Sequence, residues 1–162
     1  MKKQGFSIIE LMVTIVIMGV LAAVAVPKLF GFMAKSKAAE IYPAAGVYIK
    51  LLEAYIHEQH KGGDWTSIGY KSPAKNSTGK ASTSTFEYDA AQTTYNWTAT
   101  SITALNECSK GNIWYLNYEF EHDPANIKIW ASSSELSKCS GALTPNFSNL
   151  SSTTTAITKP GE

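Results

Sequence analysis

The longest apolar run of the chain lies at its N-terminal end. From Phe6 to Val26, 21 residues carry a single charged side chain, that of Glu10. As an α-helix with a rise of ~1.5 Å per residue, this run would span roughly 32 Å, enough for a hydrocarbon layer of about 30 Å. The pattern predicts a hydrophobic transmembrane helix over residues 6–27.

Beyond Pro27 the pattern becomes that of an amphipathic helix over residues 28–61. Its apolar positions recur at steps of three and four, with most charges off the stripe, and they include Ile41, Ala45, Tyr48, Leu52 and Tyr55. The two segments together predict one helix of about 80 Å from Phe6 to about Lys61. We expect Pro27 and Pro43 to kink or loosen it, and Gly62-Gly63 to supply a left-handed cap at its end.

The remaining sequence, residues 62–162, predicts a head domain with an antiparallel sheet. Residues 62–84 are rich in Gly, Ser, Thr and Lys and indicate a connecting loop. Strand-like segments follow at 84–88, 93–100, 113–121 and 127–131, with turn chemistry at 122–126. The expected fold is α+β, with about four strands packed on the helix stripe, and an exposed, partly ordered tail from Leu143 to Glu162.

The composition restricts the partners of the chain. The formal net charge is +1, and all 14 cationic residues are lysines. The absence of arginine disfavours bidentate recognition of phosphate or guanine. The chain holds 17 serines and 15 threonines, so its polar surface relies more on hydroxyl groups than on charges. With the apolar run, these features argue against a purely cytoplasmic globular protein.

Three interpretations fit the first segment. In the first, Lys2 and Lys3 begin a conventional signal peptide that is cut near Ala25. In the second, the segment is an uncleaved anchor. In the third, cleavage falls before the apolar run and leaves it in the mature protein. An acidic residue at the head of the run, and helical periodicity continuing past the supposed cut, count against the first.

The residues that favour the third interpretation are Lys2-Lys3-Gln4-Gly5-Phe6-Ser7-Ile8-Ile9-Glu10-Leu11. This stretch resembles the prepilin motif of type IV pilins, with a short basic leader, a Gly, a hydrophobic residue and a Glu four positions after it. Gly19 and Pro27 also stand where such helices often carry Gly and Pro. The resemblance covers about the first 30 residues and is closest to short-leader, type IVa-like major pilins.

The resemblance implies a processing route. A membrane prepilin peptidase would remove the leader, residues 1–5, by cutting after Gly5, and would N-methylate the new amine of Phe6. Removal of Lys2 and Lys3 would leave 12 lysines against 13 acidic residues. The subunit would sit in inner-membrane lipid and then pass through the pilus assembly machinery into an extracellular helical homopolymer, with its head in the periplasm and later outside the cell.

Glu10 has two readings that can coexist. A carboxylate in an apolar segment costs ~2.5–3.5 kcal/mol at mid-membrane, so a partner is expected. In a filament, Glu10 of an incoming subunit could meet the Phe6 amine of the preceding one and fix the axial register. Alternatively, Ser7-Ile8-Ile9-Glu10 is a capping-box pattern, in which Glu10 serves the start of its own helix.

Cys108 and Cys139 are the only cysteines, and in an exported domain they predict one disulfide. It would enclose the region 108–139, which pilins of this kind often expose. A metal site is disfavoured: His57-Glu58-Gln59-His60 is one residue short of a zinc-binding H-E-x-x-H pattern. We expect no catalytic residue, no metal and no cofactor.

The expected function is polymerisation into a type IV pilus, a fimbrium. The family implies cell adhesion, with twitching motility or DNA uptake as further roles. DNA contact through lysines of residues 61–80 stays open. The nearest alternatives are a minor pilin or a type II secretion pseudopilin, which share the N-terminal motif. An exported binding module with a conventional signal peptide is the alternative from another class.

Overall fold

The computed structural model describes residues 5–73, 75–77, 80–89, 96–120 and 127–152. The chain divides into two compact units, Met1–Met33 and Ala34–Glu162. Several predicted features lie outside the described residues. They are positions 1–4 of the leader, positions 93–95 of one strand, position 121 of another, the 122–126 turn and the tail from 153 onwards.

The helix α1, Ile8–Ala38, forms most of the first unit, and Pro27 lies inside it. From Ile8 to Met33 its residues are exposed, apart from a half-buried Gly31. This exposure agrees with the sequence pattern, since a helix that is apolar all round needs an apolar environment on every side. The last turn of α1 belongs to the second unit, where Ala34 and Ala38 are buried.

The predicted long helix extends from Ile8 to Gln59, with a short break before Pro43. After α1 ends at Ala38, a turn at Ala39 and Glu40 precedes α2, Ile41–Gln59. Pro43 accounts for the position of this break. It has no N–H to give the Ala39 carbonyl four residues earlier, and its ring would collide with that carbonyl. Within α2, Pro43 occupies the first turn, where N–H groups have no helical acceptor.

The prediction that Gly62-Gly63 forms the left-handed cap is wrong. The left-handed residue is His60, with φ of 52°, and its N–H donates to the carbonyl of Ile56 at 2.8 Å. The two glycines are needed for space instead. A Cβ on Gly62 would lie 2.3 Å from the Tyr118 hydroxyl, and one on Gly63 would lie 2.8 Å from Ile68 and Tyr55.

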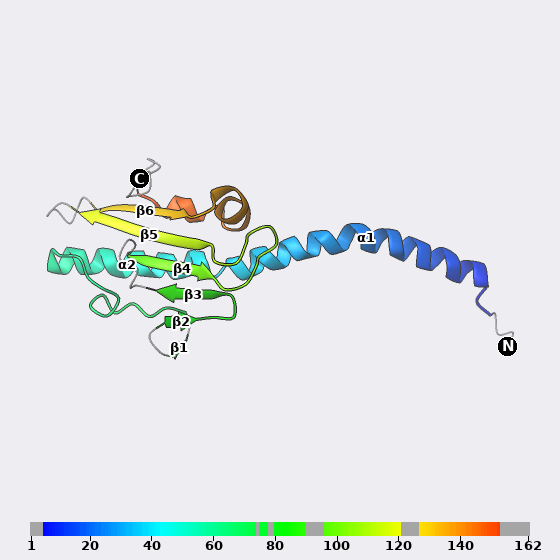
Figure 1. The fold of residues 1–162 in the computed structure, drawn as a ribbon, viewed down its shortest axis with the longest axis horizontal. Helices are drawn as coiled ribbons and strands as arrows, with labels where there is room; N and C mark the ends of the chain where they lie inside the picture. The colour runs from blue at the N-terminus through cyan, green and yellow to red at the C-terminus, as the bar shows by residue number, and fades with distance from the viewer. Residues whose placement is uncertain (1–4, 74, 78–79, 90–95, 121–126, 153–162) are drawn as a thin grey trace. The chain divides into compact units, whose positions relative to one another are not determined.

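Within the described residues, the sheet of the second unit has six strands, against about four expected. They are β1 (Lys75–Ser77), β2 (Lys80–Ser82), β3 (Phe86–Asp89), β4 (Trp97–Ser101), β5 (Ile113–Phe120) and β6 (Ile127–Ser133). Each strand pairs antiparallel with its neighbours in sequence, so the sheet is a meander with β6 at one end (Figure 1). β3 to β6 correspond to the predicted strands. β1 and β2 lie in the segment predicted to be only a loop.

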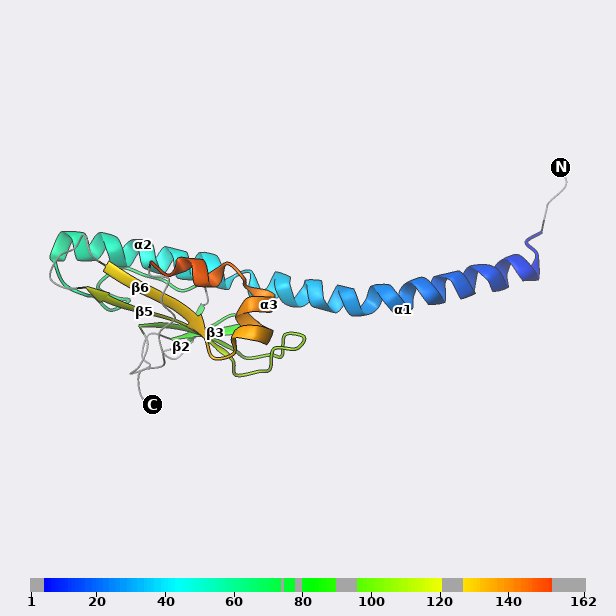
Figure 2. The same cartoon turned by 90° about the horizontal axis from the view of Figure 1, so that it is seen from above.

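One face of the sheet packs on α2 around a core rich in aromatic residues. Alternating positions of the strands point into it, as period-two patterning requires. These buried strand residues are Phe86, Tyr88, Trp97, Ala99, Trp114, Leu116, Ile129 and Ala131. The buried face of α2 supplies Ile41, Ala45, Tyr48, Leu52 and Ile56. Figure 2 shows α2 running along this side of the strands. The α+β prediction is therefore confirmed.

The segment between α2 and β1 contributes to the core through Tyr70, which is 5% exposed. Its hydroxyl donates to the carbonyl of Ala44 at 3.1 Å and accepts from the indole nitrogen of Trp97 at 3.0 Å. Its ring meets that of Tyr48 edge to face, with the centroids 5.4 Å apart. Tyr70 therefore connects this segment to both α2 and β4, in a stretch predicted to be a connecting loop.

Three short helical elements follow β6: the π-helical turn η1 (Leu136–Ser140), α3 (Gly141–Leu143) and the 3-10 helix η2 (Phe147–Leu150). Phe147 is 1% exposed, and its ring lies near that of Trp97. The hydroxyl of Thr144 accepts a hydrogen bond from the indole nitrogen of Trp114 at 2.9 Å. The prediction of an exposed tail from Leu143 is therefore wrong for its first part, which packs on the core.

Candidate functional site

The exposed apolar surface of α1 is the first feature that needs a function. Phe6 is 79% exposed and Leu21 is 65% exposed. Among the described residues, one helix is long and apolar enough to cross a bilayer, and its most apolar stretch is entirely unburied. An apolar surface of this extent requires lipid or another protein surface to cover it.

At the start of α1, Glu10 is a capping residue. Its Oε2 atom accepts a hydrogen bond from the backbone N–H of Ser7 at 2.9 Å, while the Ser7 carbonyl accepts from the N–H of Leu11 at 3.2 Å. This is the Glu half of a capping box, in which the acid satisfies an N–H that has no partner in the helix ladder. The capping role is confirmed; the pairing of Glu10 with the Phe6 amine of another subunit stays a prediction.

The glycines of this unit have no packing role within the subunit. Gly5 lies just before α1 and Gly19 lies inside it. A Cβ built on either residue would meet nothing within 4 Å. Neither position therefore requires glycine for packing within the subunit, and the predicted roles are peptidase cleavage after Gly5 and helix flexibility at Gly19. Both roles remain predictions.

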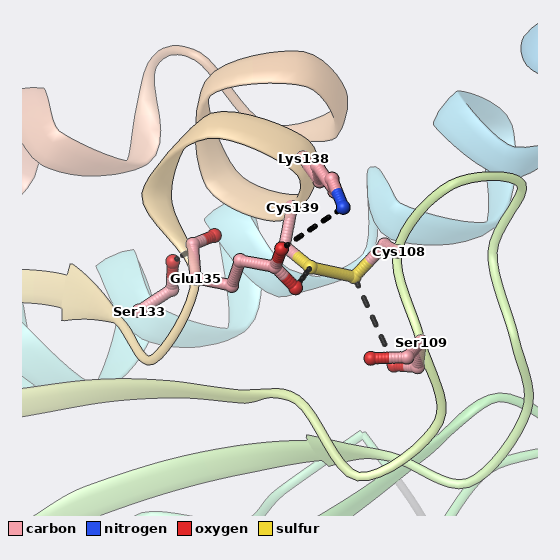
Figure 3. A network of polar contacts seen from close by, with 6 residues as sticks. All are labelled: Cys108, Ser109, Ser133, Glu135, Lys138 and Cys139. Carbon is pink, nitrogen blue, oxygen red and sulfur yellow. Dashed lines mark hydrogen bonds and ion pairs between the residues drawn. A yellow bond between two sulfur atoms is a disulfide. The ribbon is translucent and has the colours of Figure 1, made fainter.

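The disulfide joins Cys108 to Cys139, as predicted. Both cysteines are fully buried. The bond links the segment before β5 to η1 after β6, so it closes a loop around these two strands (Figure 3). Lys138 and Glu135 form an ion pair of 3.8 Å beside it, and a Glu135 oxygen also lies 3.8 Å from the sulfur of Cys139. That second contact is van der Waals in nature, because a disulfide sulfur carries no proton.

A polar contact at the α1–α2 break was not anticipated from the sequence. The Oε1 atom of Glu40 accepts hydrogen bonds from the Thr83 hydroxyl at 2.7 Å and the Tyr88 hydroxyl at 3.0 Å. Burial, followed by the adjacent Glu40 charge, raises the pKa of Tyr88. Glu40 therefore ties the helix break to the β2–β3 turn and to β3. In the sequence, the only signal for this contact was the position of an acidic residue, Glu40, three residues before Pro43.

The described part of the chain contains no group of three or more His, Cys, Asp or Glu side chains placed to hold a metal ion. His57 and His60 are exposed at the end of α2.

Comparisons with known proteins indicate the family of the chain. The model of the prokaryotic N-terminal methylation motif matches residues 1–26. A fimbrial protein of Dichelobacter nodosus is 32% identical over 70% of this chain and 67% of its own. A type IV major fimbrial protein of the same organism is 33% identical over 56% of this chain and 58% of its own.

A type IV major pilin of Neisseria gonorrhoeae is 37% identical over 48% of each chain. The aligned regions thus span from about half to two thirds of these relatives. No solved structure matches the chain. The first relative is similar across most of its length, so the likeness extends well beyond the methylation motif. With its N-terminal motif, exposed apolar helix and α+β head, the chain belongs to the type IV pilin family.

Proposed function

We propose that this protein is the structural subunit of a type IV pilus and acts by polymerising through α1. The observation that carries the proposal is the unburied apolar surface from Phe6 to Met33, joined to a head with its own complete core. Such a surface is covered by lipid before assembly and by the helices of other copies afterwards. Relatives named as major pilins and fimbrial proteins support this reading.

The proposed maturation begins with cleavage between Gly5 and Phe6 by a prepilin peptidase, which then methylates the amine of Phe6. Residues 1–5 are the leader, 6–27 the polymerisation helix, 28–61 the amphipathic half and 62–162 the head. The precursor is held in the inner membrane, and the mature subunit enters the assembly machinery and the extracellular filament. Adhesion, twitching motility and DNA uptake are the activities such a filament would support.

In the proposed filament, the carboxylate of Glu10 pairs with the Phe6 ammonium of a neighbouring copy. Each charge lies in an apolar setting, and pairing removes the cost of leaving either alone. Because only one axial placement brings the groups together, the pair fixes register more than it adds stability.

We propose that α1 loosens between Gly19 and Pro27 as the subunit leaves the bilayer. Pro27 gives no N–H to the Ala23 carbonyl, and Gly19 has a low helix propensity, so the ladder is weakest there. Pro43 acts in the same way one segment later, at the break before α2.

The test combines intact-mass measurement of the mature subunit with electron microscopy of sheared filaments. We expect a chain that starts at N-methylated Phe6. Glu10→Ala should be cleaved normally but yield few or no filaments, while Glu58→Ala, an exposed charge on α2, should polymerise normally. A mature chain starting at Val26 would show a conventional signal peptide and refute the proposal. Normal filaments from Glu10→Ala would refute only the assembly role of Glu10 and would leave the rest of the proposal standing.

A further inference from the structure

The outer edge of β6 is covered by two consecutive serines. β6 is the last strand of the sheet, and an edge strand ordinarily presents unpaired N–H and C=O groups along one side. The N–H and C=O groups of residues 127, 129 and 131 point away from β5, because the groups of the residues between them are the ones that bond to β5. In this chain the groups meet Ser151 and Ser152 instead of solvent.

The contacts are made mainly by hydroxyl groups. The N–H of Ile129 donates to Ser152 Oγ at 2.7 Å, and the N–H of Ala131 donates to Ser151 Oγ at 2.9 Å. The same hydroxyls donate back, Ser152 to the Ile127 carbonyl at 3.4 Å and Ser151 to the Ala131 carbonyl at 3.5 Å. The N–H of Ser152 donates to the Ile129 carbonyl at 3.0 Å. Two residues thus occupy five main-chain groups, because a hydroxyl can accept and donate at once.

These serines are held in place by the core. Residues 144–152, which we call the edge strap, begin at Thr144, whose hydroxyl accepts from the Trp114 indole at 2.9 Å. Phe147, 1% exposed, then fills the core beside Trp97. Thr144 and Phe147 therefore anchor the edge strap to the core before it reaches β6. This anchoring places Ser151 and Ser152 along the edge of β6, although the strap itself does not form a strand.

We propose that Ser151 and Ser152 protect the edge of β6 from strand pairing with a second copy of this chain. The seven residues of β6, Ile127–Ser133, could pair antiparallel with the same residues of another copy about a two-fold axis, since each edge offers the same donors and acceptors. Such pairing would join heads by their sheets. The strap blocks it, so that copies meet by surfaces other than this edge.

The experiment uses the full chain in detergent micelles, with Ser151→Ala/Ser152→Ala as the variant. Ser148→Ala is the matched control, because the hydroxyl of Ser148 is exposed and donates to the Pro145 carbonyl, at 3.4 Å, within the same strap. Amide hydrogen exchange at Ile129 and Ala131 reports whether the edge is open. Cross-linking of mixed isotope-labelled and unlabelled chains through Lys128, which is exposed on β6, reports pairing between copies.

We expect the double variant to exchange roughly tenfold faster at Ile129 and Ala131, the scale of one lost hydrogen bond. We also expect Lys128–Lys128 cross-links between labelled and unlabelled chains, above the background of the wild type and of Ser148→Ala. Ser151→Thr/Ser152→Thr, which keeps both hydroxyls, should behave like the wild type.

Unchanged exchange would show that the serines do not close the edge. Faster exchange without intermolecular Lys128 cross-links would show that the open edge does not pair with a second copy. Either result overturns the proposal. If the double variant does not fold, Ser152→Ala alone provides the same two readouts, since it removes the acceptor of Ile129 and keeps the Ser151 hydroxyl.

Discussion

The Oε2 atom of Glu10, in the first turn of α1, accepts a hydrogen bond at 2.9 Å from the backbone N–H of Ser7, the residue before the helix. This cap needs an acceptor oxygen and no charge, so glutamine can replace it. Pairing with an ammonium group in an apolar setting needs the charge. We therefore predict that Glu10→Gln keeps the helix and the cleavage but loses most filaments, as seen by circular dichroism, mass and electron microscopy.

Ser7→Ala is the matched control for this prediction. It keeps the Ser7 N–H that Glu10 binds and changes only the side chain, so filaments should persist. Filaments in normal number from Glu10→Gln would mean that capping is the main contribution of Glu10.

A second prediction concerns the Glu40 carboxylate at the helix break. Glu40→Ala leaves the hydroxyls of Thr83 and Tyr88 without the acceptor they share, and both lie beside the core. Loss of hydrogen bonds to a charged group should lower the free energy of unfolding by about 1.5–3 kcal/mol. Urea denaturation followed by tryptophan fluorescence measures this. Glu58→Ala, on the exposed end of α2, should change it by less than ~0.5 kcal/mol, and equal effects of the two would contradict the prediction.

A third prediction uses two histidines of similar exposure and different backbone. His60 holds a left-handed conformation with φ of 52°, which costs an L-residue about 1 kcal/mol and glycine almost nothing. His60→Gly should therefore raise the free energy of unfolding by roughly 0.5–1 kcal/mol, whereas His57→Gly, inside α2, should lower it by roughly 0.5 kcal/mol. Thermal unfolding of both variants measures the difference, and a loss of stability in His60→Gly would refute it.

A fourth prediction follows from the buried hydroxyl of Tyr70. Burial raises its pKa from 10.0 to about 12. Between these values the unfolded chain loses the proton while the folded chain keeps it, so stability is intact below about pH 10 and falls as pH rises towards about 12. Burial also raises the pKa values of Tyr48 and Tyr88, so these residues contribute to the same fall.

Tyr70→Phe should accordingly make the fall in unfolding midpoint above pH 10 shallower without abolishing it. It should also remove one alkaline component from the tyrosinate absorbance of the folded protein. Tyr42→Phe is the control, because Tyr42 is exposed on α2. A slope unchanged by Tyr70→Phe would show that this hydroxyl ionises equally in both states.

The sequence predicted those features that depend on local pattern. The unbroken apolar run gave α1, and alternation around Trp114 and Ile129 gave β5 and β6. The features that were missed depend on contacts distant in sequence. Tyr70 stands in a polar stretch, and it is buried where its hydroxyl bonds to the Ala44 carbonyl and the Trp97 indole. Phe147 follows a turn-like segment, and its buried ring packs near that of Trp97. The α1–α2 break is different, since its local signal, Pro43, stands four residues after Ala39 and was expected to kink or loosen the helix.

The disulfide also limits how far a subunit can be stretched. When force is applied to the head, a sheet whose strands separate releases chain. The Cys108–Cys139 bond spans 31 residues, so roughly 100 Å of extended chain stays locked inside the loop, even if β5 and β6 separate. With both sulfurs buried, the tether is out of reach of reductants until the head opens. A subunit unfolded by force would thus be roughly 100 Å shorter than the same chain without the disulfide.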